Sequence, residues 1–329
     1  GPLDTVYLGG GTPSLLAPAD VGRLLDTAGR HFGLSAGSEI TLEAHPTTVT
    51  MRRLEGYHAR GVTRISFGAE SLQPTELAAL GRNYTPKLAL HALELARRCG
   101  YRSIAVDLMY GLPGQTLNSW EATLRAALGA QVHHLSLYPL SVEPRTVLAR
   151  AERQGRLVLP EEEAIVDMYH SACRLLRDAG FEHYELSNWA LPGHRCRHNL
   201  ACWRDAQYYG VGVGAHGYLH PVRTENISNL KRYLEAIEAG ASAVGSREVL
   251  DEDASFTERV LLGMRLLADG LPLNDLETRP GHSDPAGLQS EITALASSGL
   301  VKVERGRMWL SEDAVPVAND IWARLLRAA

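Results

Sequence analysis

This sequence of 329 residues has little cysteine, no long apolar run and no excess of positive charge. Lys and Arg number 33 against 38 Asp and Glu, so the net charge does not steer the chain towards nucleic acid or anionic lipid. No apolar run approaches the roughly 18 residues that a membrane-spanning helix needs, and the first residues do not resemble a signal peptide. The composition favours a cytoplasmic protein that binds no nucleic acid and has no transmembrane segment, and it leaves peripheral membrane contact open.

The cysteines are too few for a disulfide framework in a chain of this length. They are Cys99, Cys173, Cys196 and Cys202, and they are widely scattered. We therefore expect reduced thiols.

The first part of the chain alternates short β-branched runs with amphipathic helical patterns, which is typical of βα units around a parallel sheet. About six such units precede residue 220, ending with the stretch HYELSNWA, so we predict an α/β fold over residues 1–220, a partial (β/α)6 TIM-like barrel. After residue 220 the pattern changes to helices, then to a hairpin around Arg305 and Gly306, and then to a final helix. This order predicts a small winged-helix-like domain over residues 221–329.

Polar residues follow successive predicted strands at the point where each strand ends. Residues 9–12 end the first strand, and Glu43, Glu70, Asp107 and Tyr138 end the next four. Because parallel strands end at one mouth, we expect these residues to gather there. Carboxylates accept hydrogen bonds from ribose hydroxyls or an ammonium group, and glycines let a ligand approach the backbone. Taken singly, Glu43 and Asp107 also fit helix caps, Glu70 fits an ion pair at the barrel rim, and the glycines fit a tight turn.

Four stretches in this order make the sequence recognisable: YLGGGTPSLL, GVTRISFGAESLQPTELAALGRNYT, VDLMYGLPGQTLNSW and LSLYPLSVEPRT. Together they resemble the radical S-adenosylmethionine (radical SAM) family that contains oxygen-independent coproporphyrinogen III oxidase and related haem chaperones. The resemblance runs through almost the whole chain. It implies the radical SAM variant of the partial barrel, with S-adenosylmethionine and a [4Fe–4S] cluster as cofactors.

The resemblance also implies which residues hold S-adenosylmethionine. Gly10, Gly11 and Thr12 match the family's glycine motif, which lies against the methionine end of the cofactor, and Glu43, Arg82 and Asp107 match positions that hold its polar groups. Glu70 stands where relatives usually have Gln, so that contact is changed to a charged acceptor. Tyr138 completes the predicted cofactor-binding set.

The family's cluster motif, CxxxCxxC, belongs immediately upstream of the glycine motif. This sequence begins with GPLDTVYLGG, and its four cysteines do not have that spacing. We therefore expect the cluster-binding cysteines upstream of the residues given, so that only the full-length protein binds the cluster. Loss of the cluster is the alternative.

The stretch HRCRHNLACWRD resembles the HNxxYW motif of the haem chaperone group. His198, Asn199 and Trp203 match it, and Cys202 takes the tyrosine position. The resemblance implies a haem site in which His198 binds iron and Trp203 stacks on the porphyrin. Arg195, Arg197 or Arg204 would pair with propionates. Cys202 and Cys196 are rival iron ligands, and an ordered loop with a structural histidine is the alternative.

Function follows from the same resemblance. The near match to HNxxYW favours a haem chaperone that binds haem and passes it to acceptor proteins, with S-adenosylmethionine and the cluster as accessory groups. An oxidase that decarboxylates coproporphyrinogen III is the second reading. A radical methyltransferase that opens haem is the third.

Overall fold

The computed structural model describes residues 1–144, 146–277 and 285–328. The chain divides into two compact units, Gly1–His198 and Asn199–Ala329. The functional division into residues 1–220 and 221–329 stays a prediction. Arg145, in the stretch LSLYPLSVEPRT, lies outside the described residues.

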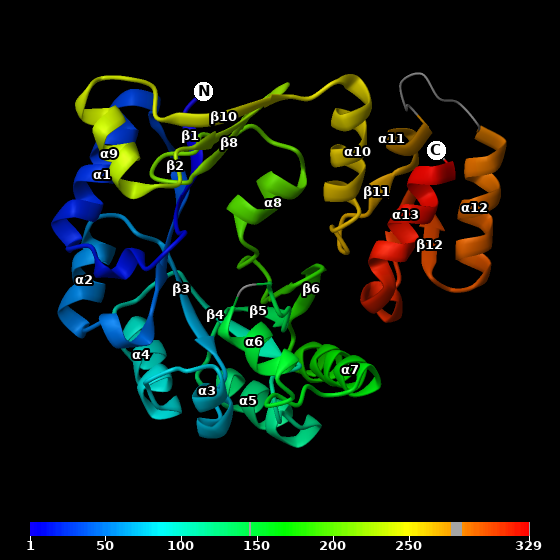
Figure 1. The fold of residues 1–329 in the computed structure, drawn as a ribbon, viewed down its shortest axis with the longest axis horizontal. Coiled ribbons are helices and arrows are strands. Elements are labelled where there is room, and N and C mark those ends of the chain that lie inside the picture. Colours follow the sequence, from blue (N-terminus) through cyan, green and yellow to red (C-terminus); the bar gives the residue numbers. More distant parts are fainter. Residues whose placement is uncertain (145, 278–284, 329) are drawn as a thin grey trace. The chain divides into compact units, whose positions relative to one another are not determined.

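The first unit is built on a seven-stranded sheet in the order β1-β2-β3-β4-β5-β7-β6 (Figure 1). Its strands are β1 (Leu3–Leu8), β2 (Leu34–Ala44), β3 (Arg64–Glu70), β4 (Ser103–Tyr110), β5 (His134–Pro139), β6 (Glu182–Glu185) and β7 (Asn188–Ala190). The strands β1 to β5 are parallel, and each pairs with the next along the chain. The sheet curls into a half-barrel, which confirms the predicted fold class.

Helices follow the strands and lie along the outer side of the curled sheet (Figure 1). They are α1 (Pro18–Phe32), α2 (Met51–Ala59), α3 (Pro74–Ala79), α4 (Pro86–Arg98), α5 (Leu117–Gly129), α6 (Val147–Arg153) and α7 (Glu162–Asp178), with the 3-10 turns η1 (Pro13–Leu15) and η2 (Pro46–Thr48). The helix α8 (Arg197–Trp203) begins at the end of the first unit and continues into the second. On α1, Val21 and Leu25 are buried whereas Leu24 and Phe32 are exposed.

The two faces of the sheet have opposite chemistry, because side chains alternate along each strand. Leu42, Ile65, Phe67, Val106 and Leu135 are fully buried and form the core beneath the helices. The alternate positions carry polar residues: Thr41, Glu43, Arg64, Ser66, Asp107, His134 and Ser136. A polar inner face is not needed to hold the sheet to its helices, so its residues are available for binding.

The stretch HYELSNWA is not the single sixth strand that we predicted. It forms a hairpin of β6 and β7, in which β7 pairs antiparallel with both β5 and β6. The two residues between these strands are Leu186 and Ser187, which are not one of the glycine-containing pairs that mark a two-residue hairpin turn in a sequence. The half-barrel therefore ends in a hairpin at its sixth position.

The second unit contains two small antiparallel sheets, in the orders β10-β9-β8 and β11-β13-β12. The strands are β8 (His216–Leu219), β9 (Val222–Asn226), β10 (Val244–Val249), β11 (Leu271–Pro272), β12 (Val301–Glu304) and β13 (Arg307–Leu310). The sequence pattern missed the first sheet: five of the six residues of β10 are exposed, so no alternation of buried apolar residues marks it.

The helices of the second unit are α9 (Leu230–Glu238), α10 (Glu252–Gly263), α11 (Leu273–Glu277), α12 (Pro285–Ser297) and α13 (Ala318–Ala328), with the 3-10 helix η3 (Glu312–Val317). From α10 the order is helix, strand, two helices and a hairpin, as in a winged-helix domain. The predicted hairpin turn is confirmed, with positive φ angles of 51° at Arg305 and 72° at Gly306.

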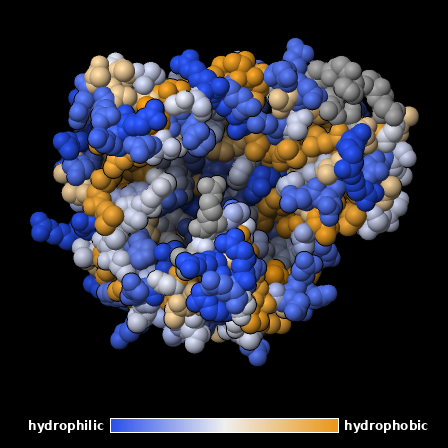
Figure 2. Space-filling view, viewed as in Figure 1, coloured by the Kyte–Doolittle hydropathy of each residue, from blue (hydrophilic) through white to orange (hydrophobic). Residues whose placement is uncertain are grey.

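No helix within the described residues is both long enough and apolar enough to cross a bilayer. Figure 2 shows hydrophobic side chains scattered among hydrophilic ones over the face in view.

Candidate functional site

The glycine loop after β1 is tied to the end of β2 by one carboxylate. The Gly10 amide donates to Glu43 Oε2 at 3.2 Å, and the Tyr7 hydroxyl donates to Glu43 Oε1 at 2.8 Å. A Cβ at residue 9 would lie 2.7 Å from the Tyr7 ring, and Gly10 has a φ of +88°, so both positions require glycine. Open space faces the Cβ positions of Gly10 and Gly11. The backbone there is accessible to a ligand.

A second carboxylate, Asp107 on β4, lies near Glu43. The Ser66 hydroxyl is 3.3 Å from both carboxylate oxygens of Asp107, and Ser136 also bonds to it. Desolvation and, to a smaller extent, the negative charge of Glu43 together raise the pKa of Asp107 to about 6, against the lowering effect of the two serines. A cationic ligand at this place would offset the repulsion between the two acids.

Glu70 and Arg82 form an ion pair, with Arg82 Nη2 2.6 Å from Glu70 Oε1. The Tyr84 hydroxyl donates to Glu70 Oε2 at 2.8 Å. The carboxylate at this position therefore orients Arg82, and the Arg82 side chain remains 43% exposed with further donors available.

The two remaining residues of the predicted cofactor site, Thr12 and Tyr138, lie close in sequence to the residues described above. Thr12 precedes η1. Tyr138 is exposed near the end of β5, two residues beyond Ser136, which pairs in register with Asp107.

The predicted cofactor offers a sulfonium, an amino acid group and a ribose. Two acids, open glycine backbone and a partly exposed arginine match those groups in charge and hydrogen bonding. The residues present fit S-adenosylmethionine. Their individual roles stay predictions.

His198, the predicted iron ligand, lies against β1 of the same unit. Its Nδ1 is 3.0 Å from the Thr5 hydroxyl, and its ring stacks on Tyr7 with centroids 5.0 Å apart. Burial lowers the pKa of His198, which favours the neutral imidazole, against a raising effect of Glu39. Because Nδ1 of His198 is hydrogen-bonded to Thr5, Nε2 is the ring nitrogen of His198 that is available to a metal.

Glu39 on β2 holds the first turn of α8 in place. Its carboxylate accepts the amide of His198 at 3.0 Å and that of Arg197 at 3.2 Å. These two amides are among those that a helix leaves without internal partners. The guanidinium of Arg197 donates to the Gly37 carbonyl at 2.8 Å and lies 3.9 Å from Asp4, so it contacts this unit's own groups.

In the second unit, Cys202 and Trp203 follow on α8. Burial raises the pKa of the Cys202 thiol, which disfavours the thiolate that would bind iron. The Arg265 guanidinium lies 4.2 Å from the centroid of the Trp203 ring and covers one face of it. Of the four residues predicted to bind haem, His198 thus has the clearest ligand geometry.

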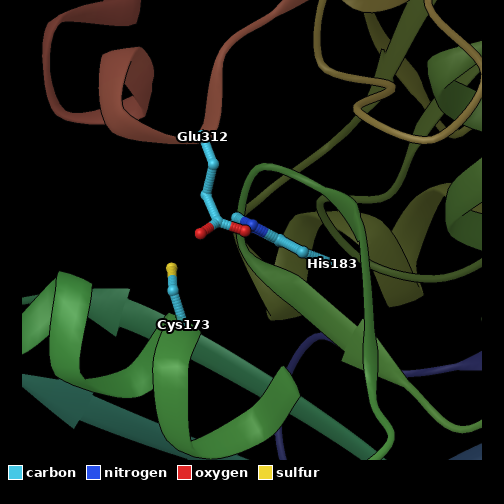
Figure 3. A group of neighbouring side chains, drawn as sticks. All are labelled: Cys173, His183 and Glu312. Atoms are coloured by element: carbon cyan, nitrogen blue, oxygen red, sulfur yellow. The ribbon is translucent and has the colours of Figure 1, made fainter. Parts of the chain in front are cut away.

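The cysteines do not form a cluster site. Across the described ranges, 1–144, 146–277 and 285–328, no three cysteines lie close enough together to hold a metal. Cys99 follows α4, and its Sγ is 3.2 Å from Met51 Sδ. Cys173 lies on α7 and His183 on β6 (Figure 3). Burial lowers the pKa of the His183 imidazole to about 3. The chain's own cysteines do not fit a [4Fe–4S] cluster.

Sequence reasoning missed Thr5, Tyr7, Glu39, Ser66 and Ser136. Each occupies an inner-face position of its strand and is not a strand-end residue, unlike the predicted Glu43 and Asp107. The alternation of side chains along each strand is the signal in the sequence that could have found them.

Comparison with known proteins agrees with this geometry. Residues 1–127 match the Radical SAM superfamily. The chain is 38% identical to the haem chaperone HemW of Mycobacterium tuberculosis, over 92% of this chain and 78% of that protein. It is 34% identical to HemW of Bacillus subtilis, over 98% of this chain and 86% of that protein.

Among solved structures, the chain is similar to coproporphyrinogen III oxidase (HemN) of Escherichia coli. The TM-score is 0.79 at 20% identity, over 98% of this chain and 77% of that chain, so this likeness concerns the fold alone. The identities of 34–38% over most of both chains establish the family. This chain belongs to the HemW family of radical SAM proteins.

Proposed function

We propose that this protein is a haem chaperone, which binds haem and delivers it to acceptor proteins. The observation that carries the proposal is the setting of His198: Thr5 takes Nδ1, Tyr7 supports the ring, and burial lowers the pKa of the imidazole. A neutral imidazole with one nitrogen hydrogen-bonded and the other available is suited to binding haem iron.

Membership of the radical SAM superfamily implies S-adenosylmethionine and a [4Fe–4S] cluster. When bound, such a pair supplies one-electron chemistry. In this chain Glu43 and Asp107 would hold the cationic groups of S-adenosylmethionine, Gly10 and Gly11 would face it with open backbone, and Arg82 would bind a carboxylate. The cytoplasmic location expected from composition stays a prediction.

The roles of Cys202 as a rival iron ligand and of Trp203 as a stacking partner of the porphyrin remain proposals. The raised pKa of Cys202 makes its thiol a poorer ligand than His198. Arg197 would have to exchange its bond to the Gly37 carbonyl before pairing with a propionate.

Hemin titration followed by the Soret band tests the proposal. We expect the unaltered protein to shift and sharpen the band. The His198→Ala variant should bind more weakly by at least the roughly 10–100-fold that loss of even an outer-shell partner costs. His91→Ala, at an exposed histidine on α4, is the matched control and should titrate like the unaltered protein.

The outcomes separate the parts of the proposal. No spectral change with the unaltered protein would reject haem binding itself. Equal affinity of the unaltered and His198→Ala proteins would reject His198 as the ligand, and Cys202→Ser would then show whether sulfur holds the iron.

A further inference from the structure

One side chain contacts both parts of the candidate site. The Tyr7 hydroxyl donates to Glu43 Oε1 at 2.8 Å, and the Tyr7 ring stacks on the His198 imidazole with the planes inclined by 27°. Tyr7 is therefore shared between a carboxylate proposed to hold S-adenosylmethionine and the histidine proposed to hold haem iron. All three residues belong to the first unit, so the arrangement depends on that unit alone.

Each contact restrains Tyr7 in a different way. The carboxylate of Glu43 also accepts the Gly10 amide at 3.2 Å, so its two oxygens are divided between the glycine loop and the Tyr7 hydroxyl. A ligand that moves or neutralises this carboxylate must change the position or strength of the tyrosine bond. At the other end, Thr5 and Glu39 hold His198 by its Nδ1 and its amide, so the imidazole responds to the ring beside it.

We propose that Tyr7 is a positioning residue that couples the two ligands, so that S-adenosylmethionine bound at Glu43 raises the affinity of His198 for haem. This rests on the proposed function of both residues. A cationic ligand paired with Glu43 keeps this carboxylate ordered, which keeps the Tyr7 hydroxyl bound and its ring against His198. Haem then binds an imidazole that is already ordered, and the ordering cost falls.

The test measures hemin affinity with and without saturating S-adenosylmethionine, by Soret titration of the full-length protein under anaerobic conditions. Couplings between sites commonly amount to about 5–150-fold in affinity, so we expect at least a fivefold tighter hemin complex with S-adenosylmethionine present. Since coupling is reciprocal, calorimetry should show hemin strengthening S-adenosylmethionine binding by the same factor.

Tyr7→Phe removes the hydroxyl and keeps the ring. We expect this variant to lose the effect of one ligand on the affinity for the other, each affinity being compared with that of the same variant without the second ligand. Tyr101→Phe is the matched control: its hydroxyl donates to the Leu54 carbonyl at 2.7 Å inside the core, so the loss of one buried hydroxyl is reproduced without touching Glu43 or His198. This control should keep the coupling.

The results distinguish the inference from the function on which it rests. Hemin binding that is unaffected by S-adenosylmethionine would overturn the coupling and leave the chaperone proposal standing. Coupling that persists in Tyr7→Phe would overturn the role of Tyr7. Failure of the unaltered protein to bind hemin would overturn both proposals.

Discussion

The imidazole of His198 stacks on the ring of Tyr7, with centroids 5.0 Å apart, and its Nδ1 lies 3.0 Å from the hydroxyl of Thr5. Both partners are on β1, the strand that ends in the glycine loop. One strand therefore orients the proposed iron ligand and carries the proposed S-adenosylmethionine loop.

Thr5→Val should weaken hemin binding by about tenfold, as expected when a metal-binding histidine loses the partner of its second nitrogen. The valine keeps the size of the side chain, so packing is preserved. Soret titration measures the effect. Thr27→Val is the control: this exposed threonine on α1 donates its hydroxyl to the Arg23 carbonyl, and the variant should bind hemin like the unaltered protein. Unchanged affinity of Thr5→Val would show that Thr5 does not orient the ring.

Glu39→Ala should destabilise the protein by about 0.5–2 kcal/mol, the usual cost of losing a helix cap, and should also weaken hemin binding. The reason is that its carboxylate accepts the first amides of α8 and so fixes His198. Glu39→Gln keeps one acceptor oxygen and should show a smaller loss in both measurements. Denaturant unfolding and hemin titration of the two variants check this order, and a loss of stability alone would contradict the positioning role.

Glu43→Gln should weaken S-adenosylmethionine binding by about tenfold or more, because hydrogen bonds to charged groups contribute about 1.5–3 kcal/mol. Glutamine has one acceptor oxygen, so it can accept from Tyr7 or from Gly10 but not from both, and the loss of binding includes the loss of one of these two hydrogen bonds. Calorimetry with S-adenosylmethionine measures the loss. Glu55→Gln on α2 is the control, and equal losses in the two variants would place the effect outside the site.

Asp107 should make stability depend on pH. Its pKa is raised from 3.8 to about 6 in the folded protein, so the folded state binds more protons than the unfolded state between these values. The free energy of unfolding should therefore fall as pH rises from about 4 to about 6, by up to about 3 kcal/mol from this group.

Asp107→Asn should remove that contribution and be the more stable protein above pH 6, as measured by denaturant unfolding across this pH range. Asp20→Asn, at the start of α1, should keep the slope of the unaltered protein. Identical slopes in Asp107→Asn and the unaltered protein would show that Asp107 is not desolvated.

The parallel strands and their helices could be predicted because local signals agree along this part of the chain. Period-two alternation marks β2 to β5, Pro18 marks the start of α1, and Gly180 follows the end of α7. The hairpin of β6 and β7 could not be predicted, since Leu186 and Ser187 lack the glycine that marks a two-residue hairpin turn, and the pairing of β7 with β5 is not a local property of the sequence. The strand β10 could not be predicted for a different reason: five of its six residues are exposed, so its sequence has no alternation of apolar residues.

The sequence by itself determined the half-barrel, the strand-end acids and the near match to HNxxYW, since these depend on local spacing and residue type. Only the tertiary structure decided which residues meet. Thr5 and His198 are 193 positions apart, and nothing local to either residue encodes their contact. The curl of the sheet brings β1 and the start of α8 together, and this contact places the imidazole next to Tyr7 and so connects His198 to Glu43.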